Sequence, residues 1–336
     1  MQTTQTVPIS FVHRLLGVAE RRGFDVMPML RAAGIPVDIA YRPKTRVTVD
    51  QMAQVTRDLW ALTQDELFGL GPPIPLGTLK FVGLSVIHAP DLREVGIRAS
   101  GATKVLTGLP RIRVHYGAEV ARVEIDISEL DDPEHLGTEL MLALTHRFLG
   151  WLVGKRIPLR ALELPYPAPP HAADYDKIFG RMATFQTGPV GRTVFSFDSN
   201  LLDAPVVRTE QDLFAFLCDQ PGVWYATRDY GSTTADRVRK ILERGLRGQW
   251  PAPEEVAARL NVSVQHLRRQ LRAQETSISD IKEEILRDAA IASLVRGEEP
   301  IDELATRLGF SEASAFRRAF RRWTGSPPGA YRWGGE

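Results

Sequence analysis

Two short stretches near the C-terminal end of this 336-residue sequence carry several arginines at helical spacing and no acidic residue. They run from Val264 to Ala273 and from Ala313 to Thr324. The arginines are Arg268, Arg269 and Arg272 in the first stretch and Arg317, Arg318, Arg321 and Arg322 in the second. Guanidinium groups bind phosphates and base edges through paired hydrogen bonds, so this pattern is typical of contact with nucleic acid. On a single amphipathic helix, however, such a face is more often simply solvated.

Both stretches belong to a repeated pattern, and the repetition favours contact with DNA. The first copy reads VAARLNVS from Val256, and the second reads LATRLGFS from Leu304, 48 residues later. In each copy the next segment places apolar residues at steps of three and four, which predicts a helix with one buried face. A short helix, a tight turn and a second helix with a cationic face form a helix-turn-helix, which places its second helix in the major groove.

A long helix is predicted between the two copies, from Ser277 to Arg296, with Gly297 able to end it. Its apolar residues follow steps of three and four, namely Ile278, Ile281, Ile285, Ala289 and Ala292. Two recognition helices bind one face of B-DNA when they lie about 34 Å apart. One rigid connecting helix fixes their separation, so a single chain is expected to reach two adjacent major grooves.

Three further segments extend this pattern: IDELATRLGFS at 301–311, AFRRAFRRWTG at 315–325 and SPPGAYR at 326–332. Together with the doubled helix-turn-helix and the connecting helix, they resemble the DNA-binding domain of the AraC/XylS family of bacterial transcription regulators. The start of the third segment departs from the family pattern where the family tolerates variation. The remaining two-thirds of the sequence resembles the sensor domain of the subgroup with an arabinose-binding-like N-terminal region.

The resemblance implies which side chains face DNA. Base edges are expected to be faced by Gln265, Arg268 and Arg269 in the first copy and by Ala313, Ser314 and Arg318 in the second. Phosphates are expected to be contacted by Arg272, Arg317 and Arg321. His266 lies among the first set and is included in the DNA-facing surface. Since Ala313 offers only an apolar contact, the second copy is expected to read sequence less stringently.

The resemblance also implies partners and regulation. The expected partners are double-stranded DNA, through adjacent major grooves, and RNA polymerase, with a small-molecule effector bound by the N-terminal region. Activation of a promoter is more usual in this family than repression. The alternative is an effector-independent regulator or an architectural DNA-binding protein. The long apolar-periodic sequence ahead of the DNA-binding part favours effector control, because a protein that only bent DNA would not need it.

Composition places the chain among ordinary globular proteins, with 43% hydrophobic and 25% charged residues. Neither a membrane span nor a signal peptide is expected, so the predicted location is the cytoplasm. The single cysteine, Cys218, allows no internal disulfide and is expected to be a small buried apolar residue. Motifs of hydrolases, P-loop proteins and zinc proteases are missing, and the seven histidines are scattered. We therefore expect neither an enzyme nor a cofactor or metal.

The first 218 residues are expected to form one α+β sensor domain, followed by a linker at 219–232 and the DNA-binding domain at 233–336. Helices are predicted within 9–32, from Thr48 or Asp50 onward, at 79–86 and at 91–106. A β-hairpin is predicted at 112–127, because apolar and polar residues alternate on both sides of a Gly-containing turn. A helix from Pro133 to Trp151, strands at 159–164 and 193–197, and a helix at 211–217 follow.

Two questions about the sensor stay open at this stage. The hairpin and the helix after it carry more apolar positions than one layer requires, which favours a homodimer. Alternatively, the strands at 159–164 and 193–197 complete one sheet within the chain. Several aromatic and histidine side chains are candidates for an effector pocket, each more often structural and none assigned: His88, His115, His146, Trp60, Tyr116 and Trp151.

Overall fold

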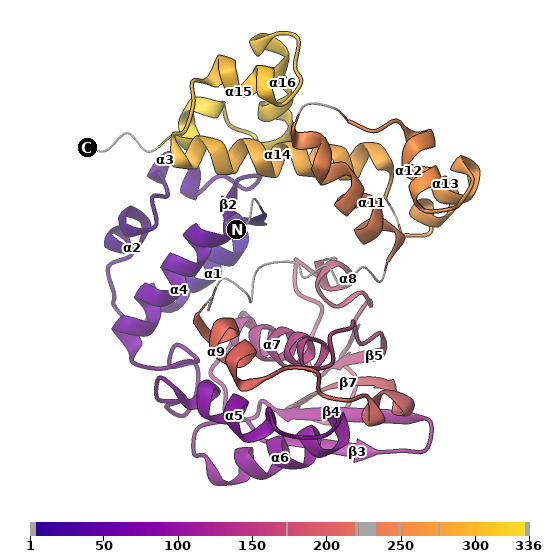
Figure 1. The fold of residues 1–336 in the computed structure, drawn as a ribbon. Helices are drawn as coiled ribbons and strands as arrows, with labels where there is room; N and C mark the ends of the chain where they lie inside the picture. Colours follow the sequence, from indigo (N-terminus) through magenta and orange to yellow (C-terminus); the bar gives the residue numbers. More distant parts are fainter. Residues whose placement is uncertain are drawn as a thin grey trace. The chain divides into compact units, whose positions relative to one another are not determined.

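A computed structural model describes residues 5–172, 174–218, 221, 233–247, 250–274 and 276–332 (Figure 1). Residue contacts divide the chain into an α+β unit, residues 56–224, and a helical unit, residues 1–55 and 225–336. Apart from residue 221, the expected linker at 219–232 lies outside the described residues, as does the side chain of Cys218. In the part of the chain that the structure describes, no helix is long and apolar enough to cross a membrane.

The α+β unit contains a five-stranded sheet in the order β3-β4-β7-β5-β6. The strands are β3 (Ile112–Tyr116), β4 (Val120–Asp126), β5 (Leu159–Leu164), β6 (Thr184–Phe185) and β7 (Arg192–Asp198). All neighbours are antiparallel except β5 and β6. The predicted hairpin is confirmed, and the predicted strands at 159–164 and 193–197 complete one sheet within the chain.

Strand register gives the β3–β4 hairpin one apolar and one polar face, whereas the central strand β7 is buried on both faces. Val123 lies opposite Val114 on one side and Phe195 on the other, whereas the neighbouring Glu124 lies opposite Arg113 and Val194. The apolar face forms the core of the unit together with the helices. Alternation of this kind is what an antiparallel sheet with one solvated face requires.

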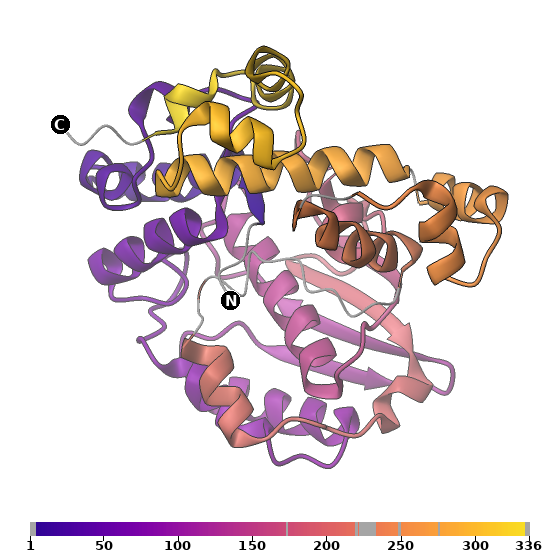
Figure 2. The ribbon, with the colours of Figure 1, turned by 45° about the horizontal axis from the view of Figure 1, so that its top comes forward.

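Helices cover the apolar face of the sheet, and α7 runs over the strands in both views (Figures 1 and 2). They are α5 (Thr78–Val86), α6 (Leu92–Val105), α7 (Leu136–Val153), α8 (Asp174–Phe179) and α9 (Glu210–Cys218), with a 3-10 turn η1 (Ser199–Asp203). Asp91 caps α6 by accepting a hydrogen bond from the Glu94 amide at 2.9 Å. Helix α7 begins at Leu136 and not at the predicted Pro133, because His135 has the left-handed φ of 58°.

The helical unit combines elements from both ends of the chain. The N-terminal ones are β1 (Thr6–Pro8), α1 (Ile9–Arg21), α2 (Met27–Ala32), α3 (Val37–Ala40), β2 (Arg46–Thr48) and the first half of α4 (Val49–Thr63). The C-terminal ones are α11 (Thr234–Glu243), η2 (Arg244–Arg247), α12 (Pro253–Arg259), α13 (Val264–Arg272), α14 (Ile278–Arg296), α15 (Ile301–Arg307), α16 (Ala313–Thr324) and η3 (Pro328–Tyr331). The sequence did not predict β1, β2 or α3.

Helix α14 is the predicted long connecting helix, and it contributes to two separate hydrophobic clusters. Ile281 and Ile285 pack with α11, α12 and α13, whereas Ile291 and Leu294 pack with α15, α16 and η3. The Ser277 side chain caps its first turn by accepting from the Asp280 amide at 3.1 Å. Gly297, at φ 66°, ends it as predicted.

The first 55 residues make their contacts with the C-terminal helices, a grouping that differs from the boundaries expected from sequence. Ile39 belongs to the second hydrophobic cluster. Strand β1 pairs antiparallel with β2, and both strands contact α14. The Thr6 hydroxyl donates to Asp288 of α14 at 2.6 Å, across 282 residues of sequence. Contacts this remote in sequence leave no local pattern to read.

Candidate nucleic-acid interface

The first copy of the helix-turn-helix consists of α12, a short turn and α13. Ser263 caps α13 by accepting from the His266 amide at 3.2 Å. Leu267 and Leu271 are buried against α14, in the hydrophobic cluster of this copy. The opposite face leaves exposed Gln265, Arg268, Arg269 and Arg272, while His266 is half-buried. The structure thus separates the buried stripe of α13 from its cationic stripe, as the spacing predicts.

The second copy, formed by α15 and α16, has the same arrangement. Phe316 and Phe320 are buried, and the half-buried Trp323 donates its indole N–H to Glu283 at 3.3 Å. The side chains exposed on α16 include Ser314, Arg317, Arg318 and Arg321, and Ala313 is half-buried. The aromatic residues of α16 therefore stabilise the helix pair.

The turns of the two copies share one backbone feature. Asn261 has φ 56° and Gly309 has φ 85°, so both occupy the left-handed region at the same repeat position. Asn and Gly are the residues that adopt this region most readily. The repetition therefore extends to the backbone conformation of the turns that precede α13 and α16.

This shared conformation gives a stability test. Gly309→Val should lower the free energy of unfolding by about 1 to 2 kcal/mol, because a side chain with a branched Cβ is strained in the left-handed region. Steric contact contributes little, since an added Cβ would have Trp250 Nε1 as its nearest neighbour at 3.9 Å. Gly309→Asn, which copies the first turn, is the control and should cost less. Urea unfolding measures both, and equal losses for Val and Asn would contradict the explanation.

The charged groups of the two faces differ in whether they already have a partner. Arg317 pairs with Asp302 of α15 at 2.6 Å. Arg269 Nη2 lies 3.2 Å from His266 Nδ1. Within the described parts of the chain, no carboxylate pairs with the other arginines that are predicted to face DNA, Arg268, Arg272, Arg318 and Arg321. Unpaired guanidinium groups on two exposed faces give the surface a local positive charge suited to a polyanion.

The length of α14 suits the distance between neighbouring major grooves. At 1.5 Å per residue, its 19 residues span about 28 Å. One turn of B-DNA is about 34 Å. Since each copy packs on a different half of α14, one helix holds both cationic faces.

The residues considered for an effector pocket all have other partners in the structure. His88 lies 3.3 Å from Glu210, and His115 lies 3.0 Å from Glu124. The Trp60 indole donates to the Glu66 carbonyl at 3.1 Å, and the Tyr116 hydroxyl donates to the Arg93 carbonyl at 3.4 Å. Trp151 stacks under the Arg208 guanidinium at 5.5 Å. The sixth residue, His146, is buried in the α+β unit.

His146 makes the stability of the α+β unit dependent on pH. Its Nε2–H donates to the Ile157 carbonyl at 2.7 Å, and burial lowers its pKa to about 4. A histidine in the unfolded chain has a pKa of about 6.5. Between these two values the unfolded chain binds a proton that the folded chain does not, so stability falls as pH decreases.

We expect the His146 contribution to be complete above about pH 6.5 and to fall by about 3 kcal/mol on reaching pH 4. Urea unfolding at pH 7.5 and pH 5 measures part of this loss. In His146→Gln the difference between the two pH values should be smaller by about 2 kcal/mol. The same pH dependence in wild type and variant would refute the assignment.

Comparison with known proteins places the chain in a family. Residues 23–206 match the family described as "Arabinose-binding domain of AraC transcription regulator, N-term", and residues 256–333 match a "Helix-turn-helix domain". The chain therefore belongs to the AraC family: it is a DNA-binding transcription regulator with a ligand-binding-like N-terminal domain, not an enzyme.

Individual relatives match over most of their length. The Ornithine utilization regulator of Pseudomonas aeruginosa is 26% identical over 335 residues, covering 98% of this chain and 97% of that protein. The transcriptional regulator VirS of Mycobacterium tuberculosis is 24% identical over 328 residues, covering 92% and 91%. The crystal structure of transcriptional regulator CdpR from Pseudomonas aeruginosa aligns over 97% of this chain and 98% of that one, with 19% identity and a TM-score of 0.30.

Proposed function

We propose that this regulator binds two adjacent major grooves through α13 and α16, activates transcription by contacting RNA polymerase, and is controlled by a small-molecule effector bound to the α+β unit. One observation supports this DNA-binding mode. Helices α13 and α16 both pack on α14, and each exposes arginines at equivalent positions of the repeat. A regulator of DNA in bacteria acts in the cytoplasm, which we propose as its location.

Within this proposal the two faces divide their contacts. Base edges are read by Gln265, Arg268 and Arg269 on α13 and by Ala313, Ser314 and Arg318 on α16, and His266 belongs to the same DNA-facing surface. Phosphates are bound by Arg272, Arg317 and Arg321. Arg317 must exchange its ion pair with Asp302 for a phosphate. Since both partners of that pair are exposed, the exchange costs little.

Selection of genomic fragments by the full chain, followed by footprinting, tests the DNA-binding mode. The expected protection covers two adjacent major grooves on one face of the duplex for each bound chain. Protection confined to one groove would refute the bipartite mode. Transcription of a selected promoter by purified RNA polymerase should increase when the chain is added; a decrease would make the protein a repressor.

The runner-up function is an effector-independent regulator or architectural protein. Screening small metabolites for those that change the affinity of the full chain for its selected DNA separates the two. An effector that binds one state of the protein more tightly shifts that affinity by its differential binding. An affinity that no ligand of the α+β unit changes would favour the effector-independent function.

We also propose a homodimer through the α+β unit, although the incomplete-sheet argument no longer supports it, since β5 and β7 complete the sheet. Support comes from Phe81 of α5 and Ile97 of α6, two neighbouring helices, which are 58% and 52% exposed. Large exposed apolar groups of this kind suit a self-association surface. Sedimentation of the full chain and of a Phe81→Glu, Ile97→Glu variant tests this; a wild-type monomer at every concentration would refute it.

A further inference from the structure

The α+β unit contains a cavity of about 140 Å³ between α5, α6, α7, α9 and the start of β3. Its wall is formed by apolar side chains, among them Val95, Ile112, Met141, Phe148 and Leu213. Interiors are normally packed with few voids larger than a water molecule, so a cavity of this size is a departure that needs a reason.

The face of α7 that borders the cavity is also incompletely packed. Leu140, Leu144 and Phe148 repeat every four residues and line the cavity, and all three are only half-buried. Opposite them, Gly83 of α5 allows Leu213 of α9 to approach so closely that an added Cβ would lie 3.1 Å from Leu213 Cδ1. Helices α5 and α9 are therefore close together at Gly83, while the cavity between the helices is not filled by side chains.

Three polar side chains border the cavity, and two are already satisfied. Both carboxylate oxygens of Glu66 accept backbone amides, from Gly77 at 2.7 Å and from Leu79 at 2.8 Å. The Thr103 hydroxyl donates to the Ser100 carbonyl at 3.3 Å and accepts from the Ile112 amide at 3.1 Å.

The third polar side chain is different. The Thr145 hydroxyl has no hydrogen-bond partner among the residues that the structure describes. No Lys, Arg or His of the described residues lines the cavity. Among the described residues that line the cavity, Thr145 is therefore the polar side chain without a hydrogen-bond partner.

The lining of the cavity therefore disfavours charged ligands. A carboxylate entering this cavity would lose its hydration without gaining an opposite charge, which is strongly unfavourable. An ammonium group would meet only the Glu66 carboxylate, whose two oxygens already accept backbone amides. Size limits the ligand further, because an apolar cavity of about 150 Å³ engineered in another protein stays dry and holds benzene.

We propose that this cavity binds a neutral, mainly apolar molecule of about six to ten non-hydrogen atoms, such as a monocyclic aromatic compound, with at most one hydrogen-bonding group, directed at Thr145. This proposal rests on the proposed function, since it names the chemical class of the effector. A neutral effector would also distinguish this chain from regulators that respond to charged amino acids. Helix α9, which lines the cavity with Phe216 and Leu217, is the last described helix before α11 of the helical unit.

Calorimetric titration of the full chain with toluene, benzyl alcohol, benzoate and ornithine at pH 7.5 tests the proposal. Toluene and benzyl alcohol should bind with a Kd on the order of 0.1 to 1 mM, and benzoate and ornithine at least about tenfold more weakly. Thr145→Val should weaken benzyl alcohol and leave toluene unchanged. Absence of saturable binding by both neutral probes, or tighter binding of benzoate or ornithine, would overturn the proposal.

Filling the cavity provides the matched comparison. Ala99→Phe places a ring into the cavity from α6 and should reduce toluene binding at least about tenfold without lowering the Tm. Ala102→Phe on the same helix, outside the lining, is the control and should keep the affinity. Equal toluene binding by the two variants refutes the site; should Ala99→Phe fail to fold, the Thr145→Val result decides.

DNA binding is measured on the same samples. A chain that binds its selected DNA sequence specifically but neither neutral probe refutes the cavity proposal alone. A chain that binds toluene but shows no sequence-specific DNA binding refutes the proposed function and leaves the cavity site in place.

Discussion

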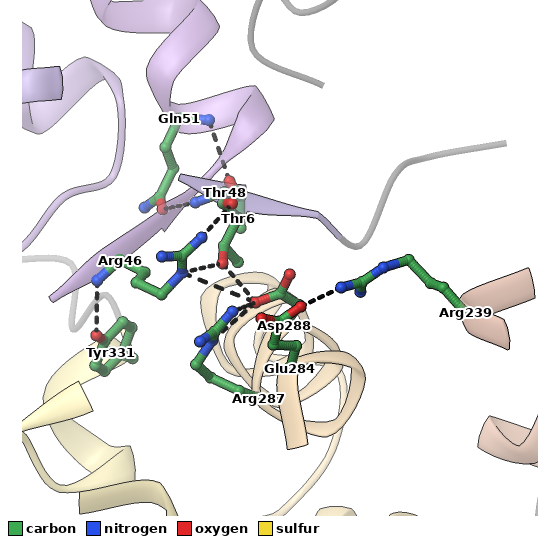
Figure 3. A network of polar contacts seen from close by, with 9 residues as sticks. All are labelled: Thr6, Arg46, Thr48, Gln51, Arg239, Glu284, Arg287, Asp288 and Tyr331. Carbon is green, nitrogen blue, oxygen red and sulfur yellow. Dashed lines mark hydrogen bonds and ion pairs between the residues drawn. The ribbon is translucent and has the colours of Figure 1, made fainter. Parts of the chain in front are cut away.

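Replacing Asp288 with alanine should lower the free energy of unfolding of the chain by about 3 kcal/mol or more. Asp288 lies on α14 beneath β1 and β2, where it accepts the Thr6 hydroxyl at 2.6 Å and Arg287 Nε at 3.0 Å, with Arg46 Nε 3.9 Å away (Figure 3). Burial lowers the pKa of Arg46, which shows how costly its charge is at this position. Removing the carboxylate leaves two poorly solvated guanidinium groups without their anion.

Denaturant unfolding measures this loss, and two variants make the result interpretable. Asp280→Ala removes an exposed carboxylate from the same helix and should cost at most about 1 kcal/mol. Arg46→Met combined with Asp288→Leu replaces the pair by apolar groups and should recover part of the loss. An Asp288→Ala variant as stable as Asp280→Ala would show that the network contributes nothing beyond surface charge.

The second large effect is expected at the DNA surface. Arg269→Ala should weaken binding of the selected operator by about 1 to 3 kcal/mol and relax the preference at one base pair, because it removes a contact to a base edge. Arg272→Ala should weaken all sequences alike and reduce the slope of log affinity against log salt by about 1, because it removes a phosphate contact.

Binding titrations on operator variants over a range of salt concentrations measure both effects. Arg296→Ala is the control, since this arginine is the last residue of α14 and pairs with Glu298. It should leave affinity and specificity unchanged. Identical sequence profiles and salt slopes for Arg269→Ala and Arg272→Ala would contradict the division between bases and phosphates.

Much of the fold could be predicted because its patterns are local. The alternation around Ile112 and Val123 predicted the hairpin, and the steps of three and four after Ser277 predicted α14 with its end at Gly297. The doubled helix-turn-helix likewise predicted which stripe of α13 and of α16 is buried. In each case the residues that specify the element lie within the element itself.

The remaining features depend on partners that sequence does not reveal. Strands β1 and β2 have three residues each, too few for a period, and their place on α14 depends on Thr6 meeting Asp288. The cavity escaped prediction for a related reason. Leu144 and Phe148 mark a buried face equally well whether that face meets side chains or an empty space.

The sharing of α14 by two hydrophobic clusters has a consequence for cooperativity. A helix propagates order along its length, so fraying at Ile291 is transmitted toward Ile285, which belongs to the other cluster. We therefore expect the two copies to open and close as one foldon, with a common free energy of opening. If the chain binds two grooves as proposed, a substitution in the core of one copy should weaken binding at both half-sites of the operator together.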